Sequence, residues 1–187
     1  MLKLLIALFF VISLISCSSI NKKKYIYKKA DVFEIIDVLN EAEKIKDSLK
    51  INGVEEVIIL HQGCNGCVSG VPQNTYIFWN QEEYIKVKRI NTYKYYSEEM
   101  MTNNIFSFYA LNREKINSEL LIPPDIELLH YNFTTVRFYL NGKIQSQIEV
   151  SDFYRTIENS NKKVLMWIYL IESNLFRTFQ YNNFLKM

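Results

Sequence analysis

The sequence is poor in cysteine, histidine and glycine, and its charges nearly balance. Its 187 residues contain three cysteines, two histidines and five glycines, with 22 basic and 20 acidic side chains. Three cysteines are too few for a scaffold built on disulfides and cannot form two zinc-finger pairs. Because the net charge of +2 provides no strongly basic face, we expect no nucleic-acid partner.

Catalytic sequence motifs are also missing. There is no G-x-S-x-G elbow, no H-E-x-x-H helix and no dinucleotide-binding G-x-G-x-x-G. Two histidines leave little for general acid–base work, although carboxylates could serve. The sequence therefore predicts no cofactor and favours a protein that is not an enzyme.

The first sixteen residues have the pattern of a secretory signal peptide. Lys3 precedes an apolar run at 4–15 that is broken only by Ser13. As a helix this run would span about 18 Å, well short of a bilayer core of about 30 Å. A basic start followed by a short apolar stretch is typical of a cleaved secretory signal.

Leu14-Ile15-Ser16-Cys17 resembles the lipobox of bacterial lipoproteins. The resemblance implies that Cys17 is acylated and becomes the mature N-terminus, so that the membrane is a partner through this lipid anchor. Ser18 resembles the residue that follows the lipidated cysteine in outer-membrane lipoproteins. Residues 17–30 then form a tether rich in lysine. The tether, the G-C-x-G-C segment and the abundance of Asn, Lys, Ile and Tyr are similar to uncharacterised lipoproteins of Bacteroidetes.

Residues 31–187 are expected to form a single α+β domain, in which two or three helices pack on a mostly antiparallel sheet. Apolar spacing predicts a helix that begins at Asp31, with Glu34 completing a capping box, and ends at Asn52-Gly53. Strands are predicted at 54–60, at 75–79 and from Glu82 or Glu83 to 90. The second and third strands would form a hairpin through Asn80-Gln81.

The second half of the domain has the same mixed pattern. A helix is predicted from Ser97, with Glu98 and Glu99 in its first turn, to the proline pair at 123–124. A hairpin is predicted over 133–150, with a three-residue loop at 140–142 that pairs Phe138 with Ile144. Ser151 would cap a short helical turn that runs to about residue 159. The apolar run at 164–171 is ambiguous between strand and helix, and the spacing of Leu175 and Phe179 favours helix.

Three of the five glycines and two cysteines fall together in the segment 62–70, within a predicted loop at 62–73. We favour a structural disulfide between Cys64 and Cys67. One alternative is a thiol–disulfide exchange site, because a C-x-x-C that follows a strand resembles the redox motif of thioredoxin-like proteins. Another is an anion-binding nest of backbone amides. A metal site is the remaining alternative, with the ligands His61, Cys64, Cys67 and His130.

These patterns predict a lipid-anchored protein of the cell outer membrane that faces the periplasm or the outside. Its expected role is binding or accessory, without catalysis, and an envelope protein is a candidate partner. Two other functions stay open, a thiol–disulfide oxidoreductase that uses Cys64 and Cys67 and an immunity or inhibitor lipoprotein that masks a partner.

Overall fold

The computed structural model of the chain describes residues 37–66, 73–92, 96–101, 104–122 and 131–185. All of these residues belong to the second of the two units into which the chain divides, Glu34–Met187. The lipobox with Cys17, the tether, Cys67 and His130 lie outside the described residues.

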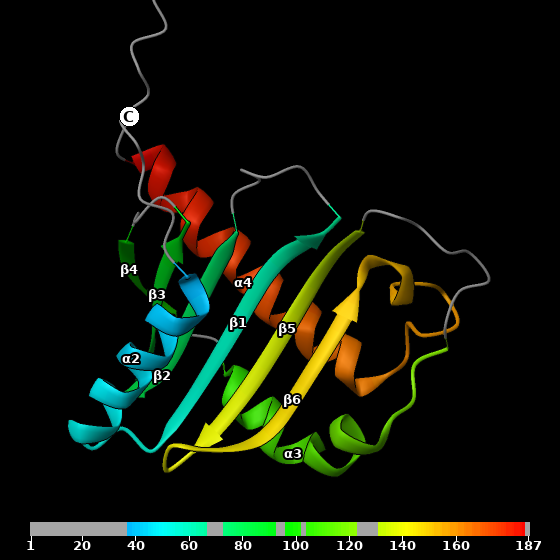
Figure 1. Cartoon of the computed structure of the whole chain (residues 1–187), viewed down its shortest axis with the longest axis horizontal. Helices are drawn as coiled ribbons and strands as arrows, with labels where there is room; N and C mark the ends of the chain where they lie inside the picture. Colours follow the sequence, from blue (N-terminus) through cyan, green and yellow to red (C-terminus); the bar gives the residue numbers. More distant parts are fainter. Residues whose placement is uncertain (1–36, 67–72, 93–95, 102–103, 123–130, 186–187) are drawn as a thin grey trace, which may run out of the picture. The chain divides into compact units, whose positions relative to one another are not determined.

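A six-stranded sheet, antiparallel at every pairing, forms the centre of the described unit (Figure 1). Its strands lie in the order β4-β3-β2-β1-β5-β6. Their bounds are β1 (Glu56–Asn65), β2 (Asn74–Gln81), β3 (Tyr84–Asn91), β4 (Tyr96–Met101), β5 (Tyr131–Leu140) and β6 (Lys143–Ser151). The chain thus runs outward from β1 to β4, crosses over and returns to pair β5 with the free side of β1.

Three α-helices cover the two faces of the sheet (Figure 1). α2 (Val38–Ile51) packs on one face, and α3 (Ile105–Ser118) and α4 (Lys163–Leu185) pack on the other. A short 3-10 helix, η1 (Asp152–Tyr154), follows β6 on the way to α4. This arrangement confirms the predicted α+β class, with helices packed on an antiparallel sheet.

The two faces of the sheet carry separate apolar cores because side chains alternate along each strand. In β1, Val57 and Ile59 contact the core under α2, while Ile58 and Leu60 contact the larger core under α3 and α4. All four side chains are at most 2% exposed. Burial on both faces explains why this strand is an unbroken apolar run rather than an alternating one.

The first described helix begins later than the sequence suggests. Asp37 lies in extended backbone and caps α2, since its side chain accepts hydrogen bonds from the amides of Leu39 and Asn40, both at 3.1 Å. Asp31, the predicted cap, lies outside the described residues. The predicted end is confirmed, because Gly53 has a φ of +83° just beyond the helix.

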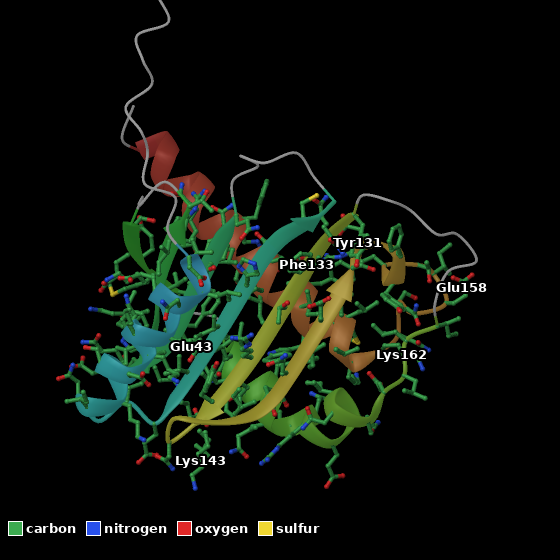
Figure 2. All side chains as sticks on the ribbon, in the orientation of Figure 1. Glu43, Tyr131, Phe133, Lys143, Glu158 and Lys162 are labelled. Carbon is green, nitrogen blue, oxygen red and sulfur yellow. The ribbon has the colours of Figure 1, made fainter. Side chains whose placement is uncertain are left out.

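Glu43, a residue of α2 (Figure 2), joins this helix to the sheet through a small ionic network. Its carboxylate accepts hydrogen bonds from Arg137 Nη1 at 3.1 Å and from the Tyr139 hydroxyl, both on β5. Lys46, one turn along α2, lies 2.8 Å from the same carboxylate and sits over the Tyr139 ring. The helix is therefore fixed to β5 by these charged groups, in addition to an apolar core that it shares with β1, β2, β3 and Tyr139 of β5.

The helix predicted from Ser97 is wrong, because residues 96–101 form the edge strand β4. β4 pairs with β3 along its whole length, Glu98 forms an ion pair with Lys86 at 3.0 Å, and Met101 is buried in the larger core. Sheet pairing has overridden a local signal that favours a helix start. The helix begins instead at Ile105, where Asn104 accepts a hydrogen bond from the Ser107 amide at 2.8 Å.

Both hairpin turns also differ from their predicted positions. Asn80-Gln81 are the last residues of β2, and the turn is made by Glu82 and Glu83, with Glu82 at a φ of +56°. In the β5–β6 hairpin Leu140 pairs with Lys143, so the loop has two residues rather than three. Asn141 and Gly142 both have positive φ, at +51° and +75°, as the favoured two-residue turn requires.

The predicted pairing of Phe138 with Ile144 is consequently wrong by two residues. Phe138 pairs with Ser146, and an irregularity between Phe138 and Tyr139 absorbs one residue of β6. Beyond the irregularity the total shift is two residues, so Phe138, Ser146 and Ile148 keep their predicted face of the sheet, whereas Ile144 pairs with Tyr139 instead. Phe138 and Val136 still face the larger core.

The apolar run at 164–171 is helical, as the spacing favoured, and forms the first turns of α4. Trp167 is fully buried there, and its Nε1 donates a hydrogen bond to the carbonyl of Ile105 at 3.0 Å, which ties α4 to the start of α3. The short helical turn after Ser151 is present as η1, but it ends at Tyr154. Among the described residues, no helix has both the length and the apolar character needed to cross a bilayer.

Candidate ligand-binding cleft

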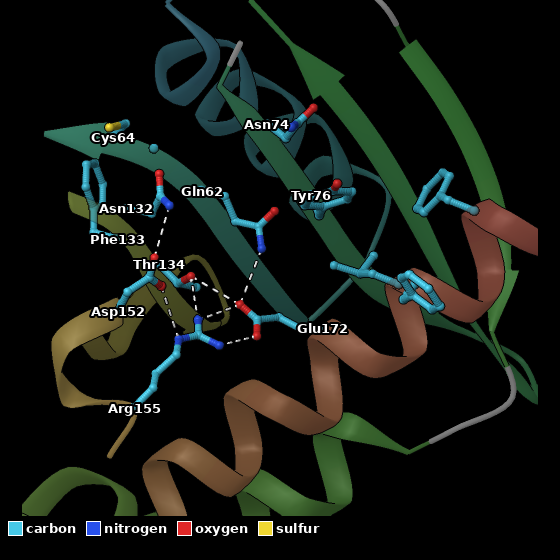
Figure 3. Close-up of a pocket in the computed structure, with 14 residues that line it drawn as sticks. Gln62, Cys64, Asn74, Tyr76, Asn132, Phe133, Thr134, Asp152, Arg155 and Glu172 are labelled. Atoms are coloured by element: carbon cyan, nitrogen blue, oxygen red, sulfur yellow. Dashed lines mark hydrogen bonds and ion pairs between the residues drawn. The ribbon is translucent and has the colours of Figure 1, made fainter. Parts of the chain in front are cut away.

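A cleft of about 550 Å³ opens between the sheet and the second half of α4 (Figure 3). Its lining comes from β1, β2 and β5 on the sheet side and from η1, Arg155 and α4 on the other. Glu172 lies at its centre, so we call this space the Glu172 cleft. The residues that line it are Gln62, Gly63, Cys64, Asn74, Tyr76, Asn132, Phe133, Thr134, Asp152, Arg155, Glu172, Leu175, Phe176 and Phe179.

The base of the cleft holds a two-point ion pair between Arg155 and Glu172 (Figure 3). Arg155 Nη1 donates to Glu172 Oε2 at 2.6 Å, and Nη2 donates to Oε1 at 2.8 Å. The side chains are only 19% and 20% exposed. Hydrogen bonding to Glu172, which outweighs the effect of burial, raises the pKa of Arg155. The pair is therefore a fixed charge arrangement rather than a loose surface contact.

The sheet supplies two further donors to the same carboxylate. Thr134 on β5 donates its hydroxyl to Glu172 Oε1 at 3.2 Å, and Gln62 on β1 donates its amide to the same oxygen at 3.3 Å. Thr134 also accepts from Arg155 Nη2 at 3.1 Å. Glu172 thus accepts four hydrogen bonds, which is about the full capacity of a carboxylate.

Asp152 holds Arg155 from the other side. One of its oxygens lies 3.5 Å from Arg155 Nε, and the other accepts a hydrogen bond from the Asn132 amide at 3.0 Å. Arg155 Nε is buried without a hydrogen-bond partner among the described residues. The guanidinium also lies 5.3 Å from the centre of the Tyr169 ring. Arg155 therefore connects η1, β5 and α4 at one point.

Aromatic rings form the opposite wall of the cleft. Phe176 is 62% exposed, while Phe179 is half-buried and packs against Tyr76 at a ring-centre distance of 5.8 Å. Burial raises the pKa of the Tyr76 hydroxyl. An apolar side chain as large as Phe176 at the mouth of a cleft leaves an unfilled apolar surface beside the polar base.

Two periodicities bring these residues together. In α4, Glu172, Leu175, Phe176 and Phe179 recur at intervals of three and four residues and share one side of the helix. In the sheet, the cross-strand pairs Gln62–Thr134 and Gln62–Asn74 place all three side chains on the face that α4 covers. The cleft is thus the point where one helix face crosses three paired strands.

The predicted loop at 62–73 starts later than expected, because β1 runs to Asn65 and pairs with β5 as far as Tyr131. Cys64 therefore lies within a strand, opposite Asn132, and lines the Glu172 cleft. Cys67, its predicted disulfide partner, lies outside the described residues. The Cys64–Cys67 disulfide stays a prediction.

His61 lies on the other face of β1 and does not line the cleft. Its side chain is 4% exposed, Nδ1 lies 3.0 Å from the Thr75 hydroxyl, and its ring packs near Phe133. Burial lowers the pKa of His61 to about 4, and the positive charge of Arg137 adds to this effect. Odd and even positions of a strand point to opposite faces, so His61 and Cys64 project away from each other.

No group of three or more potential metal-ligating side chains occurs among the described residues. Cys67 and His130, the other two members of the metal set predicted from sequence, are not described. The proposed ligand set of His61, Cys64, Cys67 and His130 therefore remains untested.

Arg155 and Glu172 are functional candidates that the sequence did not reveal. Glu172 is the only charged residue between Val164 and Phe176. A single carboxylate in so apolar a helix segment is a signal that could have been followed, because such groups are rarely buried without a partner. Arg155 gave no comparable signal, since it lies in a short polar connection.

A second cavity, of about 600 Å³, lies at the other end of β1. It contains Glu56, Glu82 and Glu83, and Asn80 donates a hydrogen bond to Glu56 at 3.2 Å. Its lining is mostly acidic and polar, and it lacks the ordered charge pairing of the Glu172 cleft.

Searches against protein-family models, curated proteins and solved structures found no match to this chain.

Proposed function

We propose that this protein is a lipid-anchored lipoprotein of the outer membrane that binds a ligand in the Glu172 cleft and does not alter it chemically. The lipid anchor rests on the lipobox resemblance at Cys17. The binding role rests on one observation, a preformed cleft of about 550 Å³ with a polar base and an aromatic wall. This combination of shape and lining is typical of small-molecule sites.

The bonding of Glu172 supports binding rather than catalysis. A general acid must carry a proton and a general base must have a lone pair directed at the substrate. Glu172 accepts hydrogen bonds from Arg155, Thr134 and Gln62, which occupy its oxygens. Asp152 is held in the same way by Arg155 and Asn132. Both carboxylates therefore serve to fix the shape of the cleft.

The position of Cys64 argues against a thiol–disulfide oxidoreductase. Catalytic thiols are commonly activated at a helix N-terminus, whereas Cys64 is a paired residue of β1. We propose instead that Cys64 and Cys67 form a structural disulfide at the rim of the cleft. Mass spectrometry of alkylated protein, with and without prior reduction, tests this pairing. Two unmodified cysteines that alkylate before reduction would contradict it.

Cell fractionation of the full chain tests the anchor. We expect the wild-type protein in the outer-membrane fraction. A Cys17→Ala variant has no thiol to acylate, so it should carry no lipid anchor. It should either retain its signal peptide or leave the membrane. Mass spectrometry of the mature N-terminus provides the direct check. A mature N-terminus that lacks lipid and starts elsewhere than Cys17 would overturn the anchor.

Thermal unfolding of the full chain in detergent tests the binding role. Envelope extract is separated into small-molecule, oligosaccharide, peptide and protein pools, and each pool is added in turn. A pool that contains the ligand should raise the melting temperature of the wild type and raise that of Phe176→Ala less. The bound compound should leave the protein with its mass unaltered. If no pool raises the melting temperature, or if the compound is consumed, the proposal fails.

A further inference from the structure

We propose that the ligand of the Glu172 cleft is a neutral carbohydrate, whose ring lies against Phe176 and whose hydroxyl groups bond to the side-chain amides of the cleft. This inference rests on the proposed binding function and adds the chemical class of the ligand. Three properties of the lining support it, namely its paired charges, its amide groups and its exposed aromatic surface.

Each charged group that lines the cleft is paired with another, although one arginine and two carboxylates leave a formal charge of −1. Arg155 forms two hydrogen bonds with Glu172 and an ion pair with Asp152. An anionic ligand that bound Arg155 would have to displace these carboxylates, and a cationic ligand would have to displace the guanidinium. Breaking such a pair leaves a half-buried charge without a partner, which costs several kcal/mol. A ligand without net charge avoids this cost.

Three amide side chains line the cleft (Figure 3), and each uses one half of its amide on a neighbouring residue. Gln62 donates to Glu172, Asn132 donates to Asp152, and Asn74 accepts from Arg89. Their other halves are two carbonyl acceptors and one amide donor. Because one end of each amide is fixed by a hydrogen bond, the other end is oriented as well. The cleft therefore presents both uncharged hydrogen-bond donors and uncharged acceptors. Hydroxyl groups, which both donate and accept, match such a lining.

The aromatic wall provides the complementary apolar surface. Phe176 is 62% exposed, while Phe179 is half-buried at the same cleft. The face of an aromatic ring carries partial negative charge and attracts polarised C–H groups. A sugar ring has a face of C–H groups and an edge of hydroxyls. A sugar can therefore pack its C–H face on the aromatic wall while its hydroxyl groups form hydrogen bonds with the amide side chains.

Two other ligand classes fit the cleft less well. A peptide commonly binds by adding a strand to a free sheet edge, but β1, β2 and β5 at this cleft each have a strand on both sides. An acyl chain would cover Gln62, Thr134 and the ion pair without bonding to them. Polar groups covered in this way lose their contact with water.

Isothermal titration calorimetry on the full chain tests the ligand class. The protein is held in a polyoxyethylene detergent, because a detergent with a sugar head group would itself occupy the cleft. The probes are maltotriose, cellotriose, mannotriose and tri-N-acetylchitotriose, with trigalacturonate as a charged sugar and a blocked neutral tripeptide as the peptide arm. We expect at least one neutral trisaccharide to bind once per chain and trigalacturonate to bind more weakly.

Variants show whether binding occurs in the cleft. Phe176→Ala and Gln62→Ala should each weaken binding about tenfold, which corresponds to the loss of one ring contact or one hydrogen bond. Met166→Ala is the matched control, since Met166 is an exposed apolar residue of the same helix that does not line the cleft. Because Phe176 is largely exposed, its variant should unfold at the wild-type temperature.

The outcomes separate this inference from the proposed function. Binding of the tripeptide or of trigalacturonate alone, weakened by Phe176→Ala, overturns the carbohydrate class and leaves the binding role intact. Saccharide binding that neither cleft variant weakens overturns the assignment to this cleft. If no probe binds, the carbohydrate class is rejected and the extract pools decide whether the binding role also fails. Cleavage of a bound saccharide confirms the class and overturns the non-catalytic role.

Discussion

Arg155 and Glu172 meet in a two-point ion pair, with N–O distances of 2.6 and 2.8 Å, at the place where η1, β5 and α4 converge. Neither residue belongs to a motif, and each is positioned by a different element. Their pairing fixes the base of the Glu172 cleft and leaves each charge with a partner. The same pair should therefore matter for stability as well as for recognition.

Removing one member of this pair should destabilise the protein more than removing both. We expect Glu172→Leu to lower the free energy of unfolding by about 3 kcal/mol, because Arg155 is left half-buried without its main counter-charge. The double variant Arg155→Met, Glu172→Leu should lose less than either of its single variants, Arg155→Met or Glu172→Leu, loses alone. Urea unfolding measures all three, and additive losses would show that the two groups are not coupled.

The matched control for this cycle is the exposed ion pair of Glu41 and Lys44 on α2. Its N–O distance is 3.5 Å and the Lys44 side chain is 67% exposed. Lys44→Ala should therefore cost less than about 1 kcal/mol.

His61 should make the protein less stable as the pH falls from 7 to 5. Its pKa in the folded state is about 4, below the value of about 6.5 for an unfolded histidine. The unfolded chain therefore takes up the proton first, and the linked loss of stability at pH 5 is about 2 kcal/mol. Urea unfolding at pH 7 and at pH 5 gives the difference in unfolding free energy between the two pH values. In His61→Gln this difference should be smaller than in the wild type by the loss attributed to His61. An unchanged difference would mean that His61 is not the titrating group.

The Asn159 side chain should hold the segment that follows α3 against the segment that precedes α4. It is fully buried, its amide donates to the carbonyl of Ile122 at 2.9 Å, and its oxygen accepts from the amide of Ile122 at 2.9 Å. We expect Asn159→Ala to cost about 2 kcal/mol, since two backbone groups lose their partners. Thermal unfolding gives the comparison with Asn112→Ala, which removes one bond to Phe108 within α3 and should cost about half as much.

The two glycines with positive φ at the ends of α2 and of β5 should respond equally to alanine. Gly53 has a φ of +83° with open space around it, and Gly142 has a φ of +75° with the Lys50 side chain 2.7 Å from an added Cβ. Each substitution should cost roughly 1 kcal/mol from the backbone. Lys50 is exposed and can move away. A much larger loss of unfolding free energy in Gly142→Ala, which a second change Lys50→Ala restores, would show that the Lys50 side chain cannot move away.

Local sequence patterns predicted those elements that short-range physics controls. The end of α2 at Gly53, the paired strands β5 and β6, and the helical nature of 164–171 all follow from apolar spacing or from a residue suited to positive φ. The same local reasoning failed at Ser97, where an acidic first turn suggested a helix. Pairing with β3 decided that segment, and no pattern within six residues can show whether a partner strand is available.

The sequence by itself determined the α+β class of the fold, while the resemblance of the segment before Cys17 to a lipobox stays a prediction. Only the tertiary structure brought Gln62, Thr134, Arg155 and Glu172 together. The reason is the strand order, since β5 returns across the sheet to pair with β1 and carries Thr134 beside Gln62 under α4. Contacts between residues about 70 to 110 positions apart depend on that pairing, which periodicity along the chain does not encode.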